Sequence, residues 1–431
     1  MNPLQPFYNM KIGVVDLSAS KAEVSVLDQE QVRRHFGGAA MNSAILAGYQ
    51  ADALIFGTGP LTGSFAPASS LMIASFASPI FNSICHVPLM LRTGPDMKFS
   101  GIDFLVVKGT APEPSILHVS QGKIRILPAE NLRHMPIPEA IRELKKASSP
   151  FQSVIVTGPA ADQGIPYASV SIGANGSLDK AGLASLMAAK NLKGIMLGGT
   201  GGLPFNRANP DQGKELEKII STDKNFKRRG FYSVLKNLEG GKDTGKFLKA
   251  KRKKDMACYH CPSPCMTHVR YLSQDTGNKE MQKSEEGLLL LDHTGCIALA
   301  NKVGKNILPV LRACWHYGLD PVAVAETLPQ GGTLPDYLNA IDKIVSDNTH
   351  RTQDVSQKQC LLGGGVPPIL TGDLWEKRVA LAIILGVCPI FLLRFPKITD
   401  AALLSFISTR EEDLKHLQDN LSSAIASFLS A

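Results

Sequence analysis

The feature that most constrains how this chain can fold is a set of four cysteines. Three of them stand in the segment CYHCPSPC, at Cys258, Cys261 and Cys265, and the fourth, Cys388, follows about 120 residues later in LGVCPIF. Three thiolates from one short, proline-containing loop and one remote thiolate make the ligand set of a [4Fe–4S] cluster. Such a cluster requires the fold to bring residue 388 next to the loop at 258–265.

Two other interpretations of these cysteines stay open. A zinc site of the C-x-x-C…C-x-x-C kind needs a second close pair of cysteines, which the sequence lacks. The second alternative is a set of unligated thiols in the core, the role that we expect for Cys85, Cys296 and Cys314, because such cysteines behave as small hydrophobic residues. The spacing favours the cluster over both and predicts a redox protein.

The composition is that of an ordinary globular protein. Its 431 residues suffice for two or three domains, and 44% of them are hydrophobic while 19% are charged. The formal charge of +8 comes partly from two basic runs, Lys227–Arg229 and Lys251–Lys254, the second of which stands just before the cysteine loop. This second run is either a solvated loop or a docking patch for an acidic electron carrier. Nucleic acid is not an expected partner, because no aromatic residues alternate with the basic ones.

Three observations lead us to expect a protein of the reducing cytoplasm. The first residues, MNPLQPFYNM, contain no basic segment followed by an apolar stretch, so no signal peptide is expected. The longest apolar run, Val379–Leu393, contains Pro389 and is shorter than the about 20 residues that span a bilayer. We therefore predict no membrane span, and a buried helix that ends at Cys388. Eight cysteines in a chain of this length do not form a dense disulfide framework.

The pattern of apolar residues predicts an α+β fold in two parts. We expect a sheet-rich N-terminal α+β domain over residues 1–205 and a mainly α-helical domain over 206–431, separated by the glycine-rich break at 198–202. Strands are predicted over 11–17, 53–56, 71–76 and 104–108, with a hairpin in LHVSQGKIRIL. Helices are predicted over 41–48, 138–147, 181–191, 212–221, 231–238, 284–291, 297–317, 334–345, 374–385 and 411–428.

Six segments, taken together and in this order, carry a family resemblance. They are GTGPLTGSFAP (57–67), MKFSGIDFLVVKGTAPEPSILHVSQGKIRI (97–126), AKNLKGI (189–195), CYHCPSPC (258–265), GLDP (318–321) and LGVC (385–388). The chain resembles the tungsten-containing aldehyde ferredoxin oxidoreductase family. The resemblance implies a tungsten bis-pterin between a sheet domain and helical domains, and a [4Fe–4S] cluster that passes electrons from aldehyde oxidation to ferredoxin. It assigns the cluster ligands to Cys258, Cys261, Cys265 and Cys388, and a pterin contact to Asp320.

The same comparison shows where this chain departs from the family pattern. Of three arginines that hold the pterin phosphates in the family, one falls within Gly37–Asn42, one on Leu71 and one on Lys180, and a second pterin aspartate falls on Ile383. Lysine can replace one arginine as a point charge, whereas the other residues cannot pair with a phosphate. The chain also lacks family sequence between about 330 and 375. We therefore expect Lys180 and Asp320 to remain as cofactor-binding residues, and we predict that bis-pterin binding is lost.

No catalytic residue can be assigned from the sequence. His350 stands in a polar stretch unlike a substrate pocket, and Glu285 and Glu286 fit the solvated start of a helix after Ser284. Two hypotheses follow: an aldehyde-oxidising member of the family, and a pterin-depleted paralogue that serves as an electron-transfer or structural subunit. For both we expect ferredoxin or another acidic electron carrier as partner, in a homo-oligomer or a larger redox complex.

Overall fold

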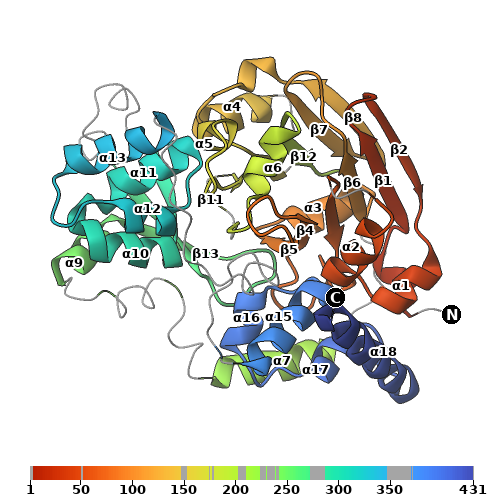
Figure 1. Ribbon diagram of the computed structural model, residues 1–431. Coiled ribbons are helices and arrows are strands. Elements are labelled where there is room, and N and C mark those ends of the chain that lie inside the picture. Colours follow the sequence, from red (N-terminus) through yellow and green to blue (C-terminus); the bar gives the residue numbers. More distant parts are fainter. Residues whose placement is uncertain are drawn as a thin grey trace.

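The computed structural model of the protein describes residues 3–49, 52–146, 153–173, 175–176, 179–201, 210–223, 230, 238, 242–271, 287–346, 370 and 372–430. Two six-stranded sheets form its N-terminal part, and helices dominate the remainder (Figure 1). The predicted α+β class is thereby confirmed.

The first sheet has the strand order β2-β1-β6-β3-β4-β5. Its strands are β1 (Lys11–Asp16), β2 (Lys21–Val26), β3 (Leu54–Thr58), β4 (Met72–Ala77), β5 (Ile84–Leu89) and β6 (Phe104–Lys108). Strand β1 pairs in parallel with β6, and the other neighbours are antiparallel. Strand β3 is buried along its whole length, as its continuous apolar run requires, whereas the edge strand β2 is mostly exposed.

The second sheet has the order β11-β10-β9-β12-β7-β8. Its strands are β7 (Ser115–Ser120), β8 (Lys123–Pro128), β9 (Ser153–Val156), β10 (Ser171–Ile172), β11 (Asn175–Gly176) and β12 (Leu192–Leu197). The predicted hairpin is β7–β8, and its two turn residues, Gln121 and Gly122, both have positive φ, as a type I′ turn demands. A third sheet, β13-β14-β15, contains β13 (Arg252–Met256), β14 (Met266–Tyr271) and β15 (Gly287–Asp292).

Helices cover the sheets and build the C-terminal half. The described ones of the first 205 residues are α1 (Gln29–His35), α2 (Gly38–Leu46), α3 (Thr93–Phe99), α4 (Ile137–Lys146), α5 (Pro159–Asp162) and α6 (Leu183–Ala189). Those that follow are α7 (Pro210–Thr222), α9 (Lys242–Lys251), α10 (His293–Val303), α11 (Ile307–Tyr317), α12 (Pro321–Thr327), α13 (Leu334–Ser346), α15 (Asp373–Leu385), α16 (Pro389–Arg394), α17 (Asp400–Leu404) and α18 (Glu411–Ser430). None of the helices in the described ranges is both long and apolar enough to cross a bilayer.

Two helix predictions need correction. The helix predicted over 284–291 is wrong, because Gly287–Asp292 is strand β15, paired along its length with β14. A short leucine run does not distinguish a buried strand from a helix, and pairing with β14 decides it. The helix predicted over 297–317 is two helices, α10 and α11, which are separated by a short 3₁₀ segment at Gly304–Asn306. Most of the helix predicted over 231–238 lies outside the described residues.

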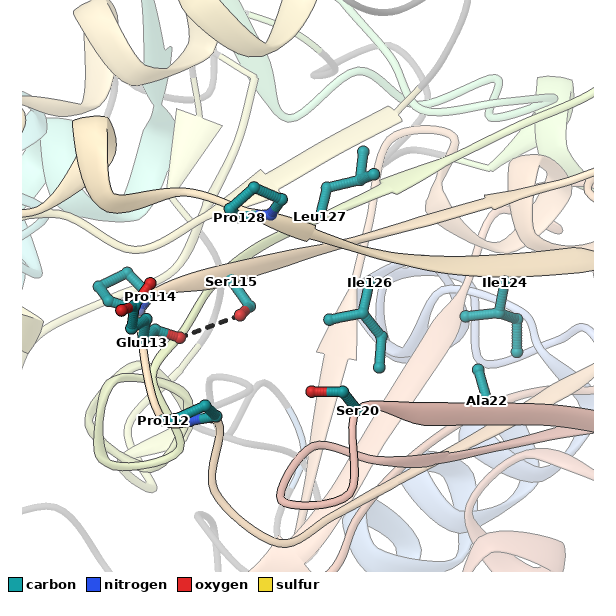
Figure 2. Close-up of a pocket in the computed structure, with 10 residues that line it drawn as sticks. All are labelled: Ser20, Ala22, Pro112, Glu113, Pro114, Ser115, Ile124, Ile126, Leu127 and Pro128. Carbon is teal, nitrogen blue, oxygen red and sulfur yellow. Dashed lines mark hydrogen bonds between the residues drawn. The ribbon is translucent and has the colours of Figure 1, made fainter.

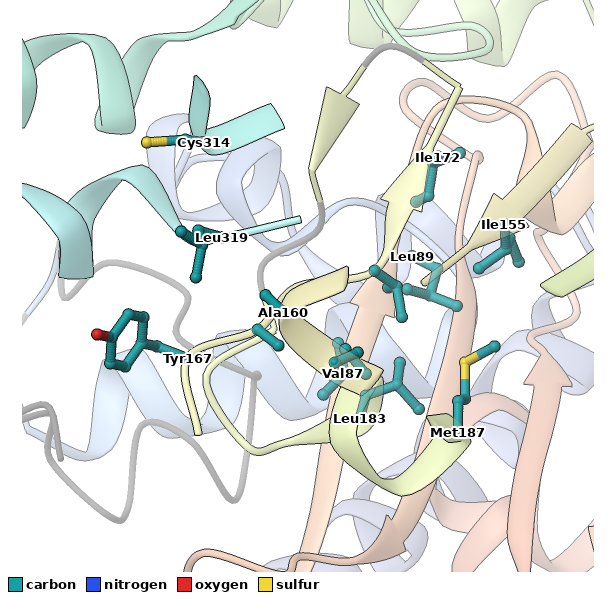
Figure 3. Packing of buried hydrophobic residues seen from close by; sticks show 14 of the residues in the cluster. Val87, Leu89, Ile155, Ala160, Tyr167, Ile172, Leu183, Met187, Cys314 and Leu319 are labelled. Atoms are coloured by element: carbon teal, nitrogen blue, oxygen red, sulfur yellow. The ribbon is translucent and has the colours of Figure 1, made fainter. Parts of the chain in front are cut away.

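The core consists of two large hydrophobic clusters. One joins the inner faces of both six-stranded sheets to helices α6, α10, α11 and α12, and Figure 3 shows Leu183 and Met187 of α6 in the same cluster as Cys314 of α11. The other packs α2 and the loop at 59–71 against α15, α16 and α18. Both clusters combine residues from before and after residue 205. The predicted boundary itself falls outside the described residues and stays a prediction.

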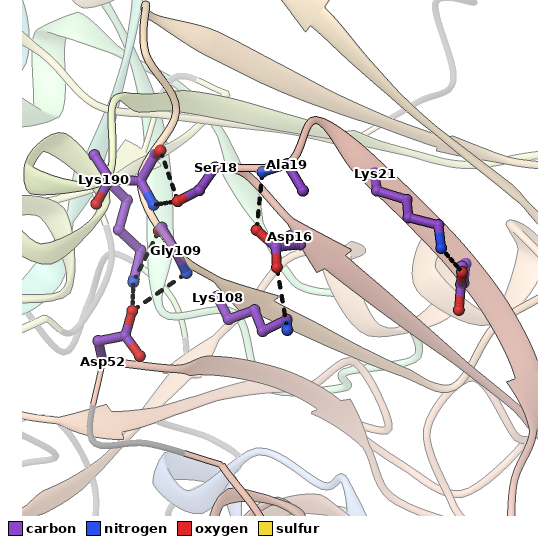
Figure 4. A network of polar contacts seen from close by, with 10 residues as sticks. Asp16, Ser18, Ala19, Lys21, Asp52, Lys108, Gly109 and Lys190 are labelled. Atoms are coloured by element: carbon purple, nitrogen blue, oxygen red, sulfur yellow. Dashed lines mark hydrogen bonds and ion pairs between the residues drawn. The ribbon is translucent and has the colours of Figure 1, made fainter.

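A polar network fastens the two six-stranded sheets to each other at one end (Figure 4). The buried ammonium group of Lys190 contacts Asp52 Oδ2 at 3.1 Å and donates to the carbonyl oxygen of Gly109 at 3.1 Å. Nearby, Lys108 pairs with Asp16 at 3.1 Å. We assign these contacts to the stability of the sheet domain.

Candidate functional site

The cysteine loop is the connection between two strands of the small sheet. Residues 258–265 join β13 to β14, which pair as an antiparallel hairpin. The loop is compact, because the Cys261 N–H donates to the carbonyl oxygen of Cys258 at 3.1 Å and the Cys261 thiol donates to that of Ser263 at 3.4 Å. His260 has a φ of 50° between them, a conformation that non-glycine residues seldom adopt. The three cysteines of the motif are therefore held by one tight turn.

Cys388 reaches this loop through the end of an apolar helix. Helix α15 ends at Gly386, whose φ of 83° suits glycine, and Cys388 is the N-cap residue of α16, with Pro389 at its first position. The apolar run 379–393 is thus two buried helices with the cysteine at their junction. The local sequence accounts for this junction, because Gly386 ends one helix and Pro389 starts the next.

One residue, Ala68, connects the two cysteine-bearing segments through its backbone. The Ala68 N–H donates to the carbonyl oxygen of His260 at 2.8 Å, and the Ala68 carbonyl oxygen accepts from the Cys388 N–H at 2.9 Å. Ala68 has a φ of 58°, which costs about 1 kcal/mol or more for a residue with a side chain. The loop at 59–71 therefore joins the cysteine loop to residue 388, a role that sequence reasoning did not assign to it.

A buried lysine holds the start of that loop. The Lys98 ammonium group donates to the carbonyl oxygens of Phe7 at 2.6 Å and Gly59 at 2.9 Å and lies 4.7 Å from the centre of the Tyr8 ring. Burial lowers the pKa of Lys98 to about 7, and the negative charge of Asp103 opposes this shift. A fully buried lysine is rare unless it is paired, so Lys98 is a strong determinant of the position of this loop.

The thiols share an apolar and electrostatically coupled environment. Cys258 and Cys388 are buried in the second hydrophobic cluster, and Cys261 and Cys265 pack against it. Burial raises the pKa of Cys258 to about 12, and the charge of Cys388 adds to the shift. The pKa of Cys261 rises for the same reasons, burial first, and burial also raises that of Cys388. Thiolates at these positions therefore need positive charge beside them.

Two neighbouring groups are placed to stabilise such thiolates. The backbone N–H of Leu91 donates to the Cys258 sulfur at 3.3 Å. The charge of Arg394 opposes the rise in the pKa of Cys261 and of Cys388, and its Nη1 donates to Ser263 Oγ at 2.8 Å. Within the described ranges no three Cys, His, Asp or Glu side chains already form a metal-ligand group. The donor set and its surroundings nevertheless fit a cluster, whose iron would supply the missing positive charge.

The two residues predicted to contact a pterin, Lys180 and Asp320, contact each other. Lys180 and Asp320 form an ion pair whose side chains are 11% and 9% exposed. Asp320 is also the N-cap residue of α12, where its carboxylate accepts from Val322 N–H at 3.3 Å and Ala323 N–H at 3.1 Å. The charge that we expected to face a phosphate is thus paired within the chain.

A neighbouring residue, Asp179, was not singled out from the sequence. Its carboxylate accepts from the N–H groups of Ala181, Gly182 and Leu183 through Oδ1, and from that of Ala184 through Oδ2, at 3.0 to 3.1 Å. Burial raises the pKa of Asp179, and these four N–H groups oppose the shift. The start of α6 therefore already holds an anion from its own chain. An acidic residue just before a helix is the signal that could have identified it.

Close backbone packing fills the region where the resemblance places the other pterin contacts. A Cβ on Gly38, which has a φ of 49°, would collide with the carbonyl oxygen of Ile383. Met41, Leu71 and Ile383 are all fully buried in the second hydrophobic cluster. A bis-pterin needs cations or unoccupied N–H groups for its phosphates. The described residues here offer apolar side chains and helix-to-helix contact, so they do not fit that cofactor.

Other residues considered from the sequence have structural positions or fall outside the description. Cys85, Cys296 and Cys314 are buried in the first hydrophobic cluster, as expected for core cysteines. Residues 285, 286 and 350 lie outside the described residues. A cavity of about 350 Å³ lies between β2 and β8, lined by Ser20, Ala22, Pro112, Glu113, Pro114, Ser115, Ile124, Ile126, Leu127 and Pro128 (Figure 2). Glu113 is the one ionisable residue of this lining, which contains no cysteine or histidine, so we assign no function to the cavity.

Comparison with known proteins supports the resemblance. Residues 12–199 match the family model of the aldehyde ferredoxin oxidoreductase N-terminal domain. The tungsten-containing aldehyde ferredoxin oxidoreductase of Pyrococcus horikoshii is 24% identical over 305 residues, which are 64% of this chain and 48% of that protein. The enzyme of the same name from Pyrococcus furiosus is 24% identical over 368 residues, 76% of this chain and 58% of that protein. The chain thus spans about half the length of the curated relatives that it matches.

Two further proteins extend the comparison. The aliphatic sulfonate oxidoreductase WOR-like subunit of Pyrococcus furiosus is 25% identical over 222 residues, 46% of this chain and 35% of that protein. Among solved structures, the active site complex BamBC of benzoyl coenzyme A reductase matches with a TM-score of 0.64 at 18% identity, over 95% of this chain and 65% of that chain. The structural match shows a shared fold. The chain is thus similar to the aldehyde ferredoxin oxidoreductase family in its N-terminal domain, and it has diverged to about 24% identity from the curated relatives that it matches.

Proposed function

We propose that this chain is an iron–sulfur redox protein of its family, with a [4Fe–4S] cluster held by Cys258, Cys261, Cys265 and Cys388. The observation that carries the proposal is the backbone of Ala68, whose N–H donates to the cysteine loop and whose carbonyl oxygen accepts from the Cys388 N–H. Two segments separated by more than a hundred residues are thereby fixed side by side, as shared ligation of one cluster requires.

The surroundings of the cysteines have defined tasks in this proposal. A bound cluster supplies one-electron transfer. The apolar side chains of the second hydrophobic cluster exclude water from Cys258 and Cys388. The Leu91 N–H and the Arg394 charge stabilise the negative charge on the sulfurs, and hydrogen bonds and charges near the sulfurs tune the reduction potential of such centres.

We further propose that the chain does not itself oxidise aldehydes. The groups that would face pterin phosphates are engaged within the chain: the N–H groups at the start of α6 donate to Asp179, and Lys180 pairs with Asp320. A relative is described as a WOR-like subunit and another as part of a BamBC complex, which supports a role as one subunit of a larger redox assembly. The competing proposal, aldehyde oxidation to carboxylic acids with electrons passed to ferredoxin, rests on the family match.

Metal analysis of anaerobically purified protein tests both proposals. We expect about four iron and four sulfide per chain, and no stoichiometric tungsten, molybdenum or pterin. Cys388→Ser should lose most of the iron and the visible absorption of the cluster. Cys314→Ser is the matched control, since that thiol is equally buried but lies in the first hydrophobic cluster, and it should keep the iron.

Different results would refute the assignment of the cluster ligands and the proposed lack of aldehyde oxidation. Wild-type protein without iron, or a Cys388→Ser variant with a full complement of iron, would refute the assignment of the ligands. Tungsten or molybdenum with pterin at about one per chain, together with aldehyde oxidation, would instead establish the competing proposal.

A further inference from the structure

The loop at 59–71 contains a buried hydroxyl group that the loop itself does not use. Ser69 and Ser70 are both fully buried. The Ser69 hydroxyl donates to the carbonyl oxygen of Ser64 at 2.8 Å, whereas the Ser70 hydroxyl makes no complete hydrogen bond within the described residues. A buried hydroxyl without a partner costs free energy, and such groups are few in folded proteins. The position of Ser70 therefore has a reason other than the packing of its own loop.

The backbone holds Ser70 beside the cysteine-bearing segments. The Ser70 carbonyl oxygen accepts from the Gly94 N–H at 3.2 Å. The next residue, Leu71, donates its N–H to the carbonyl oxygen of Gly386 at 3.3 Å, two residues before Cys388. A Cβ on Gly94 would collide with the carbonyl group of Leu71, so the two segments pack closely. Ser70 is thus fixed by backbone contacts on both sides.

The Ser70 hydroxyl lies close to the sulfur of Cys258. Burial is the main cause of the raised pKa of the Cys258 thiol, and the Ser70 side chain opposes this rise. The Leu91 N–H opposes it as well and donates to the same sulfur at 3.3 Å. Two donors of different kinds therefore stand at one sulfur. The N–H group is fixed by the backbone, whereas the hydroxyl hydrogen can rotate toward an acceptor.

The sulfur becomes a better acceptor when it binds iron. A thiol sulfur accepts hydrogen bonds weakly, whereas a cysteine that ligates a metal is a thiolate, and hydrogen bonds to charged acceptors are the stronger ones. Reduction of a cluster by one electron adds negative charge that its sulfurs share. A hydrogen bond to a ligand sulfur therefore stabilises the reduced form more than the oxidised form, and such bonds raise the reduction potential.

We propose that Ser70 raises the reduction potential of the cluster by donating its hydroxyl hydrogen to the sulfur of Cys258. This role rests on the proposed iron–sulfur function and adds a residue that controls its electron affinity. The four cysteines hold the iron, and Ser70 acts on one of them without being a ligand. Leu91 makes the same kind of contact through its backbone, so the contribution of Ser70 is the one that a side-chain substitution can remove.

Redox titration of anaerobically purified protein with dithionite measures this contribution. For Ser70→Ala we expect the ratio of reduced to oxidised cluster at a fixed potential to fall by about tenfold, a shift of about 59 mV to lower potential for a one-electron couple. The iron content should equal that of the wild type. Ser69→Ala is the matched control, because it removes a buried hydroxyl one residue away that donates to Ser64, and it should leave the potential unchanged.

A second pair of variants covers the case in which alanine disturbs the loop. Ser70→Thr and Ser70→Val introduce side chains of nearly equal shape that differ in the hydroxyl group. The threonine variant should keep the higher potential of the two, because it retains the donor. A merely structural role of residue 70 would change both variants alike.

The outcomes separate this proposal from the proposed function. Wild-type protein without iron overturns both. If all variants contain the cluster, but Ser70→Ala titrates like Ser69→Ala and the threonine and valine variants titrate alike, the role of Ser70 is refuted and the iron–sulfur function stands. Loss of iron from Ser70→Val but not from Ser70→Thr also refutes it, since the hydroxyl would then hold the cluster in place instead of adjusting its potential.

Discussion

Replacing Asp179 by alanine tests whether the start of α6 is an occupied anion site. The carboxylate accepts four backbone N–H groups at 3.0 to 3.1 Å, and Asp179 is 1% exposed. A buried N–H left without an acceptor costs about 1–3 kcal/mol, and loss of an N-cap alone costs about 0.5–2 kcal/mol. Because the four donors share one acceptor group, their losses do not add, and we expect Asp179→Ala to lower the free energy of unfolding by about 2–4 kcal/mol.

Urea denaturation followed by circular dichroism measures this loss, with an unchanged m-value as the sign that the compactness of the folded and unfolded states is unaltered. Asp179→Asn keeps one of the two acceptor oxygens and should lower the free energy of unfolding by roughly half as much. Asp28→Ala is the control, because Asp28 is the N-cap residue of α1 at a solvent-exposed position. It should lower the free energy of unfolding by less than Asp179→Ala does. Iron content should not change in any of these variants. An Asp179→Ala variant as stable as the wild type would show that these N–H groups do not depend on the carboxylate.

Two further predictions concern buried charges. Lys98→Met leaves the carbonyl oxygens of Phe7 and Gly59 without their donor and should cost about 2–4 kcal/mol of unfolding free energy, with a secondary loss of iron through the loop at 59–71. Since the pKa of Lys98 is about 7 in the folded protein and 10.5 in the unfolded chain, the unfolded state binds more protons between these values, and stability from this group rises with pH across that window. The difference in unfolding free energy between wild type and Lys98→Met should therefore grow from pH 7 to pH 9, and a constant difference would contradict the burial of an ionisable lysine. Asp320→Asn leaves Lys180 buried beside an uncharged group and should cost about 3–5 kcal/mol, of which Lys180→Met in the same chain should recover a part. A double-mutant cycle without coupling would mean that the ion pair does not form.

Local patterns in the sequence were sufficient for most of the elements near the site. The strands at β1, β3, β4 and β6 follow from apolar runs of the right length, and the β7–β8 hairpin follows from Gln121-Gly122. The helix that ends just before Cys388 follows from an apolar run interrupted by Gly386 and Pro389. In each case the deciding information lies within a few residues of the chain. The cysteine spacing likewise points to a cluster without any knowledge of the fold.

Pairings between distant segments were decided only by the tertiary structure. The strand β15 was mistaken for a helix because its leucines fit both periods, and its partner β14 lies outside any local window. The two backbone hydrogen bonds of Ala68 have no sequence signature, since any residue except proline could supply the N–H and carbonyl groups. Lys180 was expected to face a phosphate, and the ion pair with Asp320, 140 positions away, appears only when the chain is folded. Sequence thus determined which residues carry charge and sulfur, and the fold decided which of them meet, because a charge is compensated by whatever group packing brings nearest.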